Sequence, residues 1–121
     1  MKSTASTFVA LLFLSRNVAH SAHLNTDSYA KHMALNAFYD EVIELADKFA
    51  EAWMGRKLEK IGEIPELPSP RGDILTVLKR HLEVIEETRD FVPKDDTALN
   101  NIIDEIVGLY LSTIYKLKFL G

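Results

Sequence analysis

Apolar and polar residues alternate along most of this chain with the spacing of an α-helix. Between about Ser6 and about His23, apolar or small residues recur every three or four positions. A stripe of this kind places one face of a helix against a core. The residues that form it are Phe8, Leu11, Leu12, Ser15, Val18, Ala19 and Ala22. We therefore expect a first helix here, ending at the turn formed by Asn25, Thr26 and Asp27.

A second helix is predicted from Ser28 to Arg56, because this segment has no proline and no glycine before Gly55. Gly55 lies where it could end the helix. Asp27 or Ser28 can cap its start. The apolar face that we expect consists of Leu35, Tyr39, Val42, Ile43, Ala46, Phe49, Ala50 and Trp53.

The segment 57–72 has the composition of a long connection. It contains Pro65, Pro68 and Pro70, which forbid a continuous helix. Ile61, Ile64 and Leu67 are expected to anchor it to the helices. A connection of this length suits a crossover that spans a helical bundle.

Two further helices follow, one from about Arg71 to about Phe91 and one that ends near Phe119. Pro93 stops the first, and Asp95 or Asp96 can cap the second. The last helix carries two interleaved series with a period of seven residues, which is the pattern of an antiparallel bundle seam. These are Leu99, Ile106, Thr113 and Leu120, and Ile103, Tyr110 and Leu117. The sequence predicts an all-α protein, an antiparallel four-helix bundle that forms one domain over residues 1–121.

Composition narrows the classes of protein that fit. The chain has 121 residues, 47% of them hydrophobic, no cysteine and a formal net charge of −4. The lack of cysteine excludes a thiolate metal site and agrees with a reducing cytoplasm. An acidic chain without a cluster of Lys and Arg is not expected to bind nucleic acid.

The N-terminal segment has an alternative interpretation. Lys2, the apolar run Phe8 to Leu14 and the small residues around Ala19 have the pattern of a secretory signal peptide. The protein would then be secreted and its mature chain would begin near Ala22. The apolar run is too short to span a bilayer, so no membrane association is expected.

The stretch from His23 to Glu51 holds the candidate chemistry. It begins with His23 and His32 and ends with two carboxylates four positions apart, Asp47 and Glu51. At about 100° per residue, Asn36, Asp47 and Glu51 lie within about 60° of one another on a helix. Imidazole and carboxylate groups on one helix face are ligands for iron, manganese or zinc. This acidic stripe lies beside the apolar face, as ligands do in a bundle interior or at a subunit seam.

These residues resemble the ferroxidase segment of Dps-type ferritins, which oxidise and store iron. His23-Leu24-Asn25 matches a His-Trp-Asn element with Leu in place of Trp, and His32 matches the histidine that opens the second helix. Asp47 and Glu51 have the family's spacing from His32, whereas Asn36 stands where an Asp belongs. The resemblance implies a ferritin-like bundle that dimerises about its first two helices. Its metal site would be shared, with histidines from one chain and acids from the other.

The chain also resembles a group of small uncharacterised phage proteins, through SYAKHMALNAFYDE, the segment 52–55 and NIIDEIVGLYLSTIYKLKFL. This resemblance leaves a second function class open, a non-catalytic helical scaffold with a degenerate metal site. Acids spaced by four on a helix are usually a solvated face, and histidines near helix ends are often caps or polar packing residues. Asn36, a neutral amide, would weaken a second metal site, so ferroxidase activity is uncertain.

Other polar residues have structural as well as chemical interpretations. His20 can be a further ligand or the partner of a nearby carboxylate. Asp40 and Glu44 can add to the site or form an entry path for cations. His81 lies on an apolar stripe and is expected to be a hydrogen-bonded core residue. Tyr110 and Tyr115 are expected to pack with their hydroxyls in water.

Overall fold

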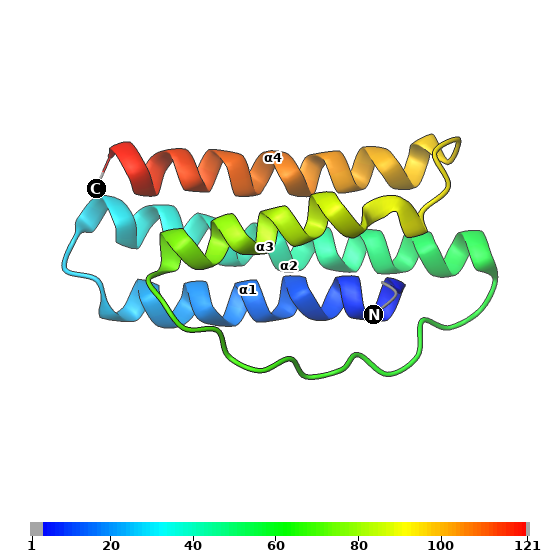
Figure 1. Ribbon diagram of the computed structural model, residues 1–121, viewed down its shortest axis with the longest axis horizontal. Helices are drawn as coiled ribbons and strands as arrows, with labels where there is room; N and C mark the ends of the chain where they lie inside the picture. Colours follow the sequence, from blue (N-terminus) through cyan, green and yellow to red (C-terminus); the bar gives the residue numbers. More distant parts are fainter. Residues whose placement is uncertain (1–3, 121) are drawn as a thin grey trace.

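A computed structural model describes residues 4–120, and these form four α-helices, one short 3₁₀ helix and no β-strand (Figure 1). The predicted all-α class with four helices is confirmed. The elements are α1 (Ala5–Asn25), α2 (Tyr29–Lys57), α3 (Ile74–Thr88), η1 (Arg89–Phe91) and α4 (Thr97–Phe119). In this part of the chain no helix is both long and apolar enough to cross a membrane.

The four helices lie side by side, and α2 and α3 run in the direction opposite to α1 and α4 (Figure 1). α1 and α4 each pack against both α2 and α3. One apolar core is shared by all four helices. Aromatic pairs fill it, such as Phe8 with Phe49 at 4.8 Å between ring centroids and Phe38 with Tyr110 at 5.0 Å.

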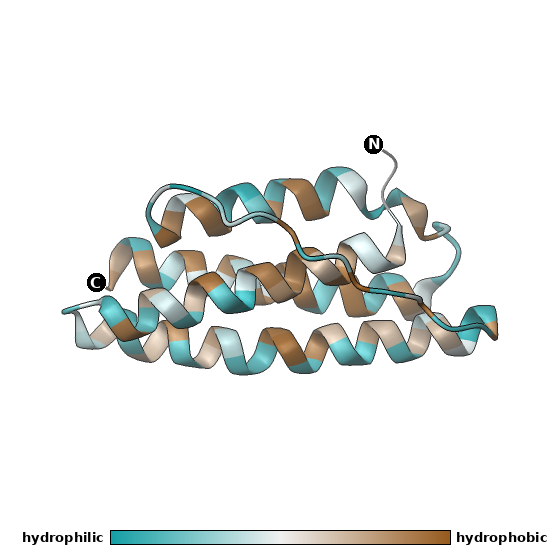
Figure 2. Ribbon diagram, turned by 90° about the horizontal axis from the view of Figure 1, so that it is seen from below, coloured by the Kyte–Doolittle hydropathy of each residue, from teal (hydrophilic) through white to brown (hydrophobic). Residues whose placement is uncertain are grey.

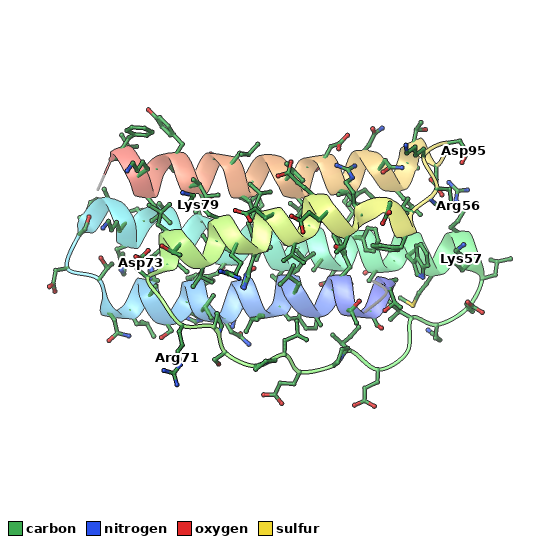
Figure 3. All side chains as sticks on the ribbon, viewed as in Figure 1. Arg56, Lys57, Arg71, Asp73, Lys79 and Asp95 are labelled. Carbon is green, nitrogen blue, oxygen red and sulfur yellow. The ribbon has the colours of Figure 1, made fainter. Side chains whose placement is uncertain are left out.

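The connection from α2 to α3 crosses the bundle over α1 (Figures 1 and 2). Ile61, Ile64 and Leu67 are half-buried and pack against the core, as the sequence predicted. Polar residues between these anchors stay at the surface, and Arg71 extends away from the helices (Figure 3). Periodic burial of single apolar side chains therefore holds a segment that has no regular structure of its own.

Side-chain caps fix where the helices begin. Thr4, Ser28, Asp73 and Asp96 each accept a hydrogen bond from the backbone N–H three residues later. Such caps satisfy an N–H group that the helix leaves without a partner. The hydrogen bond that the Thr76 N–H donates to Asp73 also lowers the pKa of the Asp73 carboxyl.

The predicted end of the second helix was correct to within one residue, whereas the predicted start of the third helix was wrong by a few residues. α2 continues past Gly55 to Lys57, one residue beyond the predicted end at Arg56, and Leu58 caps it in the left-handed conformation (φ 57°) and donates its N–H to the Met54 carbonyl. α3 does not begin at Arg71, because Gly72 has φ 111° and Asp73 then caps the helix. Glycine tolerates that conformation, so it ends the extended connection immediately before the cap.

The seam of α4 follows the two seven-residue series. Six of the seven residues in these series are buried, Leu99, Ile103, Ile106, Tyr110, Thr113 and Leu117. The exception is Leu120, which lies just beyond the helix and is 54% exposed. The period of seven thus identified the inner face of the helix.

Candidate functional site

His23 and His32 join the end of α1 to the start of α2. Nδ1 of His23 lies 2.8 Å from the His32 carbonyl oxygen, and Nδ1 of His32 lies 3.0 Å from the His23 carbonyl oxygen. Their rings stack with centroids 3.7 Å apart. A carbonyl oxygen only accepts, so each Nδ1 carries the proton and donates it. The pair satisfies one of the last carbonyls of α1, which its own helix leaves free.

A second layer of polar aromatic contacts continues along the same junction. His20 stacks on Tyr39 with ring centroids 4.2 Å apart, and the Arg16 guanidinium lies 5.6 Å from the same ring. The Tyr39 hydroxyl donates to the Asn36 side-chain oxygen over 2.8 Å. The expected carboxylate partner of His20 is therefore replaced by an aromatic ring. Asn36 is held by Tyr39.

Asp47 and Glu51 lie on the exposed side of α2, as do Asp40 and Glu44. A position for these acids in the bundle interior is therefore wrong. Fifteen residues of helix separate His32 from Asp47, which is about 22 Å along the axis. Among residues 4–120, no three His, Asp or Glu side chains gather closely enough to hold a metal ion. The donor set of one chain does not fit a metal, and the shared site stays a prediction.

A buried polar network crosses the centre of the bundle. The Tyr110 hydroxyl on α4 donates to Oγ of Ser15 on α1 over 2.6 Å, and Ser15 Oγ lies 2.7 Å from Nδ1 of His81 on α3. All three side chains are buried. The Ser15 hydroxyl needs an acceptor for its proton, and we assign His81 Nδ1 as that acceptor. The proton of the histidine ring is then on Nε2. The network thus ties three helices together.

This environment keeps His81 neutral and Tyr110 protonated. Burial lowers the pKa of His81 below its ordinary value of 6.5, and the positive charge of Arg80 lowers it further. Burial raises the pKa of the Tyr110 hydroxyl, although its bond to Ser15 acts in the opposite direction. The prediction that His81 is a hydrogen-bonded core residue is confirmed. The prediction of a wet Tyr110 hydroxyl is wrong, whereas Tyr115 is 54% exposed.

A cavity of about 640 Å³ lies between α1, the long connection and the start of α3. Asn17, Ser21 and Asn25 follow one another along its α1 side, and apolar residues of the connection form much of the opposite wall. Glu66 is the one titratable side chain in its lining, which contains no histidine. The cavity is separate from both the histidine pair and the buried network.

Sequence reasoning did not predict the buried network as a unit. Its signal was present, because Ser15, His81 and Tyr110 each occupy an inner position of a predicted helix. Polar residues on three inner stripes need one another as partners. Only the alignment of the helices along their axes, which periodicity does not give, brings the three to one level.

The fold and these contacts define an all-α protein whose polar clusters join helices to one another. Residues 23–117 match the family of unknown function DUF5856, and the chain belongs to that family. It is also similar to an uncharacterised 14.6 kDa protein from the mobD–ri intergenic region of Enterobacteria phage T4. The two are 28% identical over 117 residues, which cover 96% of this chain and 89% of the phage protein. No solved structure gives a significant match.

Proposed function

We propose that this protein is a non-catalytic, phage-type helical bundle that acts through contacts with other protein chains. One observation carries the proposal: the side chains best suited to catalysis or metal binding are used to hold helices together. His23 and His32 bond to backbone carbonyls, and His81 is enclosed with Ser15 and Tyr110. The likeness to a phage protein over nearly the whole chain supports the same conclusion.

Exposed apolar side chains give the bundle a means of contact. Several lie at the end where α2 begins and α4 ends (Figure 1). Leu24 is 70% exposed, Tyr29 77%, Met33 49% and Phe119 69%. Large exposed apolar groups at one end of a bundle can contribute to a protein interaction site. The order of the helices and the long connection support a ferritin-like fold used as a scaffold in the cytoplasm.

A metal site shared between two copies is the second candidate, and one observation favours it. Because Nδ1 of His23 and of His32 donates to a carbonyl, Nε2 is the ring nitrogen of each histidine that is left to bind a metal. Metal-binding histidines commonly have this arrangement. Asp47 and Glu51 of a second copy would have to approach the pair through a dimer about α1 and α2. Iron, zinc or manganese would then be held by residues of both chains.

Anaerobic titration with Fe(II), followed by oxygen, separates the two candidates. We expect no saturable binding that depends on the acids, so wild type and Asp47→Ala/Glu51→Ala should give the same titration. Glu83→Ala/Glu87→Ala is the matched control, because these two acids are also exposed and four positions apart but lie on α3. Saturable binding that only the first double variant abolishes, with oxidation on adding oxygen, would replace the scaffold by the metal site. Cross-linking in the producing cell should also give a defined complex with a protein chain.

A further inference from the structure

The outer face of α4 carries a row of exposed apolar side chains. Leu111 is 53% exposed, Tyr115 54% and Phe119 69%. α4 packs against α2 and α3 through its other side (Figure 1). The rings of Tyr115 and Phe119 lie against each other with centroids 5.6 Å apart. The helix is therefore apolar on its inner seam and on part of the opposite face.

These residues belong to a second seam with its own regular spacing. Asp104, Gly108, Leu111, Tyr115 and Lys118 are all exposed and follow one another at intervals of four, three, four and three residues. This alternation is the spacing of residues at a helix-to-helix contact. The spacing shows that these five residues lie on one face of α4, and Leu111 and Tyr115 are the apolar side chains on this face that a second helix could cover.

Gly108 gives an independent indication of close approach. It lies in the middle of α4, where glycine is unfavourable relative to alanine. A Cβ atom at this position would meet nothing within 4 Å, so packing within one chain does not require glycine. A small residue flanked by Leu111 and Tyr115 leaves room for a bulky side chain from a partner helix.

We propose that the partner is a second copy of this chain, whose α4 packs antiparallel on the first. This inference rests on the proposed function, since it names one partner of the scaffold. The two-fold axis passes beside Leu111, which contacts the partner's Leu111. Tyr115 then covers the partner's Gly108, and Lys118 lies opposite the partner's Asp104. Large and small residues are complementary in this register.

Charge favours a second copy in this orientation. α4 carries Asp104 and Glu105 in its first half, the latter paired with Lys48 over 3.1 Å, and the basic residues Lys116 and Lys118 near its end. Antiparallel pairing places acid against base at both ends of the contact, whereas parallel pairing places like charges together. Asp104 already accepts a bond from Arg89 at 2.8 Å, and a carboxylate has room for a further donor. One helix pair is smaller than a standard interface, so the dimer should depend on concentration.

The test combines sedimentation analysis with a cross-link. Wild type should shift from monomer to dimer as its concentration rises through the micromolar range, and Tyr115→Glu should remain a monomer. Because the chain has no cysteine, Leu111→Cys introduces a single thiol. Mild oxidation should convert most of that variant to a disulfide dimer. Val84→Glu and Val84→Cys are the matched controls at an exposed apolar residue of α3.

The controls should dimerise as wild type does and cross-link only at the rate of random collision. Circular dichroism should give equal helix content for every variant. A chain that is monomeric at all concentrations, or a dimer that Tyr115→Glu leaves intact, would overturn the antiparallel α4 pair. A complex with a different protein in the producing cell would then preserve the proposed function without this partner, so the two failures are distinguishable.

Discussion

The hydroxyl of Tyr110 donates to Oγ of Ser15 over 2.6 Å, although the two residues are 95 positions apart. Both side chains have no exposed surface. Ser15 in turn donates to His81, so a serine hydroxyl is the central member of a chain of hydrogen bonds. Within residues 4–120, neither the Tyr110 hydroxyl nor His81 Nδ1 has another hydrogen-bond partner. The relative positions of α1, α3 and α4 are therefore coupled through Ser15.

We expect Ser15→Ala to destabilise the protein more than Tyr110→Phe does. The alanine leaves the Tyr110 hydroxyl and His81 Nδ1 buried without partners, and each such group costs about 1–3 kcal/mol. The phenylalanine removes one donor but keeps the bond from Ser15 to His81, for a loss of about 1 kcal/mol. Urea denaturation measures both free energies of unfolding. Equal losses would contradict the central role of Ser15.

Stability should fall in mildly acidic solution because of His81. Its pKa is lower in the folded protein than its ordinary value of 6.5, so the unfolded chain binds the proton first as the pH falls. The stability that buried, neutral His81 contributes is fully present above its ordinary pKa. It is lost progressively as the pH decreases toward the pKa of His81 in the folded protein. Urea midpoints measured between about pH 7.5 and about pH 5 should therefore decline. The decline should be smaller in His81→Gln, which retains the other three histidines.

The junction of α1 and α2 should behave as one unit. His23→Ala and His32→Ala each remove one hydrogen bond and the shared ring stack, which should cost about 1–2 kcal/mol in unfolding free energy. The double variant should lose less than the sum of the two, by about 0.5–1 kcal/mol, because the second change no longer breaks the stack. His20→Ala combined with His32→Ala is the control and should be closer to additive. Urea denaturation of wild type, the three single variants and the two double variants completes both cycles.

Periodicity predicted the inner faces of the helices well, because burial of apolar stripes is a local property of the sequence. The inner residues of α4 were assigned in this way, and so were the anchors Ile61, Ile64 and Leu67. Helix ends were less predictable. The start of α3 was predicted a few residues too early, because Gly72 has φ 111° and Asp73 then caps the helix.

The candidate site illustrates a different limit. The spacing from His32 to Asp47 and Glu51 predicts which residues share a helix face, but it cannot say which face is covered. The core requires Phe38, Val42 and Phe49 to point inward, and this turns Asp47 and Glu51 toward solvent. The outer seam of α4 was equally visible in the sequence. It gained meaning only when the fold left Leu111 and Tyr115 exposed.

Gly108→Ala should stabilise the isolated chain while it weakens self-association. Alanine is more favourable than glycine within a helix by about 1 kcal/mol, and a methyl group at this position meets no atom of the same chain. Thermal unfolding of dilute protein should therefore occur at a higher temperature. In concentrated protein the same methyl group would occupy the space that the partner's Tyr115 needs, so the dimer should dissociate more readily.

Gly55→Ala is the matched control, because Gly55 is an exposed glycine of α2 that also has no neighbour within 4 Å of its Cβ position. This control should raise the unfolding temperature and leave sedimentation unchanged. If both variants change dimerisation equally, the dimer gives no reason for a glycine at position 108.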